Sequence, residues 1–160
     1  MRSAEAVIDR LTRAALTVAT AESCTGGALA AALVSVPGAS AVFPGGIVSY
    51  AEKAKQTLLG VPAALIAEHG VVSPEVARAM AEGARAALSV DLAVATTGVA
   101  GPSGGTPETP VGTVCIAVSG MHGTAMYTEH LSGDRDEVRR AAVEAALMRL
   151  TAYLDEGGLL

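Results

Sequence analysis

The chain has 160 residues, of which 51% are hydrophobic, only 2% are aromatic and 18 are glycines. This length is typical of a single domain, whose core must be packed from Ala, Val and Leu side chains. The chain holds 11 basic and 16 acidic residues, a net charge of -5, and no Lys/Arg cluster interleaved with aromatic residues, which argues against a nucleic-acid-binding face.

The apolar stretches are too interrupted for a membrane protein. The longest apolar run without a charge, Cys24–Ile47, is broken by glycines and prolines, and residues 1–13 carry charges throughout. We therefore expect neither a membrane span nor a signal peptide, and a cytoplasmic location. The two cysteines, Cys24 and Cys115, lack metal-ligand spacing, so we predict no disulfide framework and no metal site.

Apolar periodicity in the first half of the chain predicts helices that alternate with strands. Glycine and proline pairs supply the breaks between these elements. In chain order we expect a helix at 4–15 capped by Ser3, a strand at 16–21, a helix at 28–36, a strand at 45–50, and helices at 51–59 and 63–68.

The second half is richer in strands. Ser73-Pro74 is typical of a helix start, with Ser as the N-cap and Pro at the first helical position. We expect, in order, a helix to Leu88, a strand at 91–97, a glycine-rich loop at 97–107, an antiparallel hairpin of strands at 111–119 and 124–131, and a helix at 134–154. In this last helix, capped by Gly133-Asp134, we expect Met148 to point inward and Arg135, Arg139 and Arg140 to lie at the start or exposed side. The full element order follows from these two halves. This order predicts one domain over residues 1–160, folded as a three-layer α/β/α sandwich with a mixed β-sheet.

The segment 21–27 joins the first strand to the helix that follows. A sharp strand-to-helix turn would lift Ser23 above the sheet edge and aim the helix N–H groups at a ligand. Thr25 and Gly26 would let that ligand approach the backbone closely. In the alternative interpretation, Ser23 or Thr25 only caps the helix and the glycines only pack.

The chain also carries the side chains of a Ser–Lys acyl-transfer site. Ser23 would be the nucleophile, Lys55 its base if burial lowers the pKa of the amine, and backbone N–H groups the oxyanion stabiliser. Against this, Lys55 lies in a charged helical segment of a kind that usually faces solvent. Cys24 is a rival nucleophile, since the field at a helix N-terminus activates a thiolate.

Seven ordered motifs resemble one family, the CinA C-terminal domains, or nicotinamide-nucleotide amidohydrolases. They are TAESCTGG from Thr20, PGAS from Pro37, GIVSYAEKAK from Gly46, HGVVS from His69, TGVAGPSGG from Thr97, PVGTV from Pro110 and GDR from Gly133. The resemblance implies hydrolysis of the carboxamide of nicotinamide mononucleotide to nicotinate mononucleotide and ammonia, without a metal or other cofactor. It also implies a dimer or larger homo-oligomer, and a stand-alone form of a domain that follows an N-terminal domain in larger members.

Position by position, the resemblance assigns the catalytic roles to Ser23 as nucleophile, Lys55 as base and Tyr50 as the active-site tyrosine. Members commonly have Tyr-Ser-Asn-Glu-x-Lys, and the spacing of five between Tyr and Lys selects Lys55, not Lys53. We expect the substrate to contact Thr25, Gly26, Gly46, Thr97 and Arg135. Its phosphate would suit either a helix N-terminus or Arg135.

Two other functions stay open at this stage. The domain would be a nucleotide-binding or regulatory module if Ser23 only hydrogen-bonds a phosphate. It would be a different hydrolase if Cys24 is the nucleophile.

Overall fold

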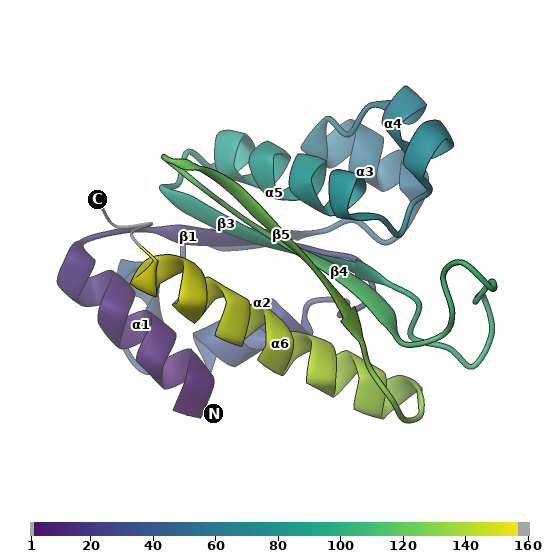
Figure 1. The fold of residues 1–160 in the computed structure, drawn as a ribbon. Helices are drawn as coiled ribbons and strands as arrows, with labels where there is room; N and C mark the ends of the chain where they lie inside the picture. Colours follow the sequence, from purple (N-terminus) through teal and green to yellow (C-terminus); the bar gives the residue numbers. More distant parts are fainter. Residues whose placement is uncertain (1, 157–160) are drawn as a thin grey trace.

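A computed structural model describes residues 2–156. Within these residues the chain forms six α-helices, one short 3-10 helix (η1) and five strands (Figure 1). The helices are α1 (Arg2–Ala14), α2 (Ala28–Val34), α3 (Glu52–Leu59), α4 (Ala63–His69), α5 (Pro74–Leu88) and α6 (Arg135–Asp155), with η1 at Ala39–Ala41. The strands are β1 (Val18–Glu22), β2 (Gly45–Val48), β3 (Leu92–Gly98), β4 (Thr113–Gly120) and β5 (Gly123–His130).

The strands form a mixed sheet in the order β2-β1-β3-β4-β5. The first three strands are parallel, and β4 and β5 are antiparallel to their neighbours. Helices α1, α2 and α6 cover one face, while α3, α4 and α5 cover the other (Figure 1). The predicted three-layer α/β/α sandwich, its mixed sheet and the β4–β5 hairpin are therefore confirmed.

Side-chain size differs between the two faces of the sheet. Along β3, Leu92 and Val94 face the layer of α1, α2 and α6, whereas Ala93 and Ala95 face the layer of α5. β1 and β4 alternate in the same way, and α5 itself buries three alanines. Small side chains on both surfaces let α5 lie close to the sheet, which explains how a chain with so few aromatic residues packs a core.

The connections leave the parallel strands toward opposite faces. β1 leads into α2 on one face, and its neighbour β2 leads into α3, α4 and α5 on the other. Such a switch between adjacent parallel strands opens a crevice at their carboxyl ends, where folds of this kind bind ligands. The segments that follow β1, β2 and β3 meet at this edge of the sheet.

Helix termini follow the predicted capping signals in two cases and differ in one. The Ser73 hydroxyl accepts the Val76 N–H, and Asp134 forms a capping box at the start of α6. The prediction that Ser3 caps the first helix is wrong, because α1 begins at Arg2 and the Ser3 hydroxyl donates to Glu144.

Two smaller expectations also fail. β1 begins two residues later than predicted, because the Leu16 N–H donates to the Leu11 carbonyl and closes the end of α1. Met148, predicted to point inward, is 59% exposed, since it lies one position beyond the buried stripe of α6 that contains Leu147. Within residues 2–156, every helix is too short or too polar to span a bilayer.

Candidate active site

Ser23 lies immediately after β1, in a pocket at the carboxyl edge of the parallel strands. Its N–H donates to the Thr96 carbonyl at 3.0 Å, so the turn begins as a continuation of the sheet. The pocket has a volume of about 200 Å³. Its walls come from the segments after β1 and β2, from α3, from the segment before α5, from the end of β3 with its loop, and from α6. Its lining residues are Ser23, Cys24, Tyr50, Lys55, Val71, Val72, Thr97, Gly98, Ala100 and Arg135.

Lys55 reaches into this pocket from α3 and is 0% exposed. Its Nζ donates to the Ser23 Oγ at 2.9 Å, and to the carbonyls of Ser49 at 2.6 Å and Tyr50 at 3.4 Å. The interpretation of this helix as a wholly solvated surface is therefore wrong. Lys53 on the same helix is exposed, but position 55 falls on the face that packs onto the sheet edge.

Burial lowers the pKa of Lys55 from its ordinary value, because a buried ammonium loses the hydration that stabilises its charge. The nearby Cys24 and Glu52 act in the opposite direction but are weaker. An ammonium can donate to all three oxygen neighbours, and the free amine has a lone pair that can accept the Ser23 proton. The geometry therefore combines a hydroxyl with an amine that loses its proton more readily than an exposed lysine does.

Cys24 is buried in the same pocket beside Ser23. Burial raises the pKa of its thiol to about 11, because a thiolate there would be poorly solvated. The thiol is therefore protonated at neutral pH, and a protonated thiol is a poor nucleophile. This environment disfavours Cys24 as the attacking group.

Glu22, which is not among the expected site residues, is a fully buried carboxylate at the end of β1. It accepts hydrogen bonds from the N–H groups of Gly27, Leu29 and Ala30 and from the Thr25 hydroxyl. These are the free donors at the start of α2, so the expectation that they point at a ligand is wrong. The available signal was a charged residue inside an apolar strand, directly before a glycine-rich turn.

Three residues expected to contact substrate do not line the pocket. The Thr25 hydroxyl is buried and donates to Glu22, and Gly26 lies on the outer side of the turn at a φ of 60°. Gly46 pairs with Thr20 in the sheet, where a Cβ would come within 2.1 Å of the Thr20 Oγ1. The Thr25 side chain and the two glycines therefore serve local structure and packing between strands.

Thr97, Tyr50 and Arg135 do line the pocket. The Thr97 hydroxyl donates to the Val71 carbonyl at 2.9 Å. Arg135 donates to the Gly101 carbonyl at 2.7 Å and to the Tyr50 hydroxyl at 3.0 Å. Arg135 thus joins the segment after β2 to the loop after β3, and the exposed Tyr50 ring lies at the pocket mouth.

A second pocket of about 350 Å³ adjoins the first and shares Ala100 and Arg135 with it. It lies between the loop after β3 and the start of α6, and it includes Asp134 and Asp136. The capping box occupies the N–H groups of Asp134 and Glu137 at the start of α6. Arg135 is the one basic side chain among the residues that line this second pocket.

Metal-ligating side chains are dispersed over the molecule. Across residues 2–156, no group of three or more His, Cys, Asp or Glu side chains lies close enough together to hold a metal ion.

The fold and the site together define a three-layer α/β/α domain with a buried Ser–Lys pair at the carboxyl edge of its parallel strands. The chain belongs to the CinA C-terminal domain family, whose family model matches residues 1–154.

Named relatives and solved structures agree with this assignment. The chain is 55% identical to a CinA-like protein of Anaeromyxobacter dehalogenans over 92% of its own length and 36% of that protein. It is 52% identical to a CinA-like protein of Mycolicibacterium gilvum, over 89% of its own length and 34% of that protein. The chain therefore spans about a third of the length of these curated relatives.

Two solved structures match over nearly their full length. The competence/damage inducible protein CihA from Agrobacterium tumefaciens has a TM-score of 0.92 and 40% identity, with 94% of this chain and 93% of that chain covered. A competence-damaged protein (CinA) superfamily protein from Klebsiella pneumoniae has a TM-score of 0.93 and 34% identity, with 97% of both chains covered.

Proposed function

We propose that this domain hydrolyses the carboxamide of nicotinamide mononucleotide to nicotinate mononucleotide and ammonia. The observation that carries the proposal is the 2.9 Å contact between the Lys55 Nζ and the Ser23 Oγ inside a pocket. An amide is a poor electrophile, so its hydrolysis needs both an activated nucleophile and a group that protonates the leaving nitrogen. A buried Lys beside a Ser can supply both functions.

In the first half of the reaction, the Ser23 Oγ attacks the amide carbon and its proton passes to the free amine of Lys55. The resulting tetrahedral intermediate carries its negative charge on the former carbonyl oxygen. The ammonium of Lys55 then donates its proton to the amide nitrogen, the carbon–nitrogen bond breaks and ammonia leaves. Ser23 remains as an ester of the substrate acid.

In the second half, a water molecule attacks the ester carbon and gives a proton to Lys55. The ester bond to Ser23 breaks, Lys55 returns the proton to the Ser23 Oγ, and the carboxylic acid product ionises and leaves. The Tyr50 hydroxyl accepts a hydrogen bond from Arg135 and has no hydrogen bond to Ser23 or Lys55 within the described chain. In this proposal Tyr50 therefore shields the pocket instead of relaying the proton.

The N–H groups of Cys24 and Thr25 are the donors that we assign to the oxyanion. Neither donates a hydrogen bond to an oxygen in the part of the chain that the structure describes. Burial dominates the raised pKa of the Cys24 thiol, but hydrogen bonding from both N–H groups acts on it in the lowering direction, so both N–H groups lie close to this sulfur. The sulfur, a weak acceptor, lines the pocket. Backbone N–H groups beside a nucleophile are the usual donors to an acyl-transfer oxyanion, and an oxyanion is a stronger acceptor than a thiol.

The sizes of the two pockets suggest how the nucleotide would bind. About 200 Å³ is small for a whole ligand site, so the pocket at Ser23 would take the carboxamide end. The ribose and phosphate would then lie in the adjoining pocket of about 350 Å³. We assign the phosphate to Arg135, because Arg135 is the one basic side chain that lines this pocket and Glu22 occupies the N-terminus of α2.

The experiment is ammonia release from nicotinamide mononucleotide by the purified protein with a chelator present, compared with Ser23→Ala. We expect release by the wild type and loss in the variant. Tight nucleotide binding without ammonia release would overturn the proposal and support a binding or regulatory module. Release that survives in Ser23→Ala and disappears in Cys24→Ala would instead identify a thiol hydrolase.

A further inference from the structure

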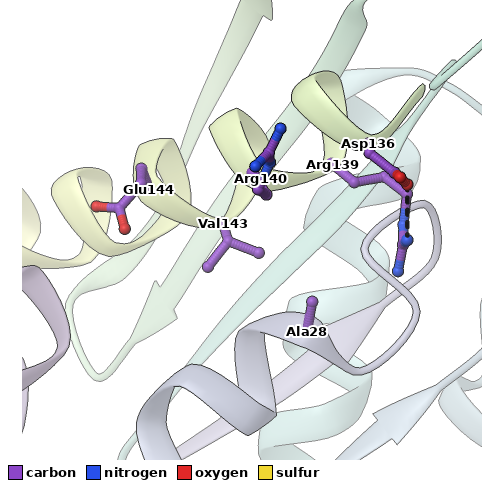
Figure 2. A pocket seen from close by; sticks show the side chains of 6 residues that line it. All are labelled: Ala28, Asp136, Arg139, Arg140, Val143 and Glu144. Carbon is purple, nitrogen blue, oxygen red and sulfur yellow. Dashed lines mark ion pairs between the residues drawn. The ribbon is translucent and has the colours of Figure 1, made fainter. Parts of the chain in front are cut away.

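Arg139 connects α6 to the backbone of the turn that carries Ser23. Its Nε donates to the Cys24 carbonyl at 3.2 Å, and its Nη2 donates to the Thr25 carbonyl at 3.1 Å. Figure 2 shows the guanidinium extending from α6 beside the segment that precedes α2, with a dashed line to Asp136. The expected position of Arg139, at the start or exposed side of its helix, gave no indication of this contact.

The position of the Cys24 carbonyl fixes the direction of the next N–H group. In a trans peptide, the C=O of one residue and the N–H of the next point in opposite directions within one plane. Because Arg139 holds the Cys24 carbonyl on the side of α6, the Thr25 N–H of the same peptide must point to the other side. This N–H lies within hydrogen-bonding reach of the Cys24 sulfur, and Cys24 lines the pocket.

The adjacent peptide supports the same arrangement. Its carbonyl, that of Thr25, also accepts from Arg139, and its N–H, that of Gly26, donates to the Ser23 carbonyl at 3.0 Å. One guanidinium therefore fixes two consecutive peptide planes beside the nucleophile. A planar group with several fixed donors can hold two carbonyls together, which a lysine ammonium on a flexible chain does less well.

We propose that Arg139 is a positioning residue that aims the Thr25 N–H at the oxygen of the reacting carbonyl. This inference rests on the proposed function, because it gives that N–H its role in acyl transfer. Arg139 does not line the pocket that holds Ser23, whereas Arg135, one turn earlier on α6, does. It acts on the reaction through the backbone and not by contact with the substrate.

The surroundings of Arg139 make its replacement feasible. The guanidinium borders a groove of about 610 Å³ between α6 and α2, and its side chain is 35% exposed. Asp136, its ion-pair partner at 3.7 Å, is 79% exposed, so loss of the arginine leaves no buried charge. Figure 2 shows that the next residue, Arg140, turns away from α2. Arg140 therefore offers a matched control on the same helix.

The test measures steady-state ammonia release from nicotinamide mononucleotide by Arg139→Met, Arg139→Lys and the control Arg140→Met. Crystal structures of the wild type and Arg139→Met are compared alongside. We expect Arg139→Met to lower kcat by about 100-fold while KM stays unchanged, because misdirected catalytic donors cost about this much. Arg139→Lys should recover part of the loss, and Arg140→Met should match the wild type. The Cys24–Thr25 peptide should be rotated in the Arg139→Met crystal structure.

Each other outcome overturns the inference. Wild-type kcat in Arg139→Met, or a raised KM with the peptide unmoved, would show that Arg139 does not position the N–H. A loss of kcat shared equally by Arg140→Met would indicate a general charge effect. If the wild type releases no ammonia, the proposed function fails, and the peptide orientation in the two crystal structures still decides whether Arg139 sets the direction of the Thr25 N–H.

Discussion

The Nζ of Lys55 lies 2.9 Å from the Oγ of Ser23, although the two residues are 32 positions apart in the chain. They come from different elements: Ser23 follows the end of β1, and Lys55 lies on α3, after the neighbouring strand β2. Parallel pairing of β1 and β2 brings their carboxyl ends together, and this pairing places the amine over the hydroxyl.

Replacement of Lys55 is expected to abolish most of the activity without loss of the fold. Lys55→Met keeps an unbranched side chain in the buried space but removes the base, and general-base catalysis contributes roughly 10²–10⁴-fold. Ammonia release should therefore fall by about that factor, while the thermal unfolding midpoint stays at or above the wild-type value because a buried amine is gone. Lys53→Met, at an exposed position of the same helix, should leave turnover unchanged. Comparable activity in the two variants would remove Lys55 from the mechanism.

The rate of hydrolysis should rise with pH. Only the free amine of Lys55 can accept a proton, and the free amine predominates above its pKa. Burial lowers this pKa from 10.5, so kcat/KM should increase with pH through a midpoint below 10.5. A pH profile of ammonia release measures this midpoint. A rate that falls as the pH rises through this range would contradict a lysine base.

Cys24 should react slowly with alkylating reagents in the folded protein. A pKa of about 11 in place of 9.0 leaves about 100-fold less thiolate at neutral pH. Labelling by iodoacetamide, followed by mass spectrometry of the Cys24 peptide, should be correspondingly slower than in the urea-unfolded chain. Rapid labelling of the folded protein would show that the thiolate is accessible and would revive Cys24 as a nucleophile.

Glu22→Gln is expected to lower the free energy of unfolding by about 2–4 kcal/mol, since hydrogen bonds to a buried charge are worth more than those to a neutral group. Both carboxylate oxygens accept backbone N–H groups of α2, and an amide nitrogen in either position would face a donor. Urea unfolding at neutral pH measures the change. Glu52→Gln, at an exposed position, is the control. An equally small change in unfolding free energy for both substitutions would show that the Glu22 carboxylate does not stabilise the start of α2.

Gly46→Ala tests whether this glycine serves packing or substrate binding. The added Cβ would lie 2.1 Å from the Thr20 Oγ1 across the β1–β2 pairing, so we expect a loss of about 1–3 kcal/mol in unfolding free energy. Truncation of the partner in the double variant Thr20→Ala, Gly46→Ala should recover part of this loss. Full stability of the single variant, combined with a raised KM, would return Gly46 to the substrate site.

The chain by itself determined the features that depend on local pattern. Apolar periodicity predicts the order of helices and strands, and with it the three-layer sandwich and its mixed sheet. Turn and cap residues predict the β4–β5 hairpin and the caps at Ser73 and Asp134. The same motifs drew attention to Ser23 and to the spacing between Tyr50 and Lys55.

Only the tertiary structure decided how the polar side chains are used. Lys55 lies among charged neighbours and becomes a buried amine because packing turns one face of α3 toward the sheet edge. Glu22 occupies the N-terminus of α2, and Arg139 holds the Ser23 turn from 115 positions away. Such contacts join elements that are distant in sequence, and no local periodicity encodes them, because they arise only when the layers pack against one another.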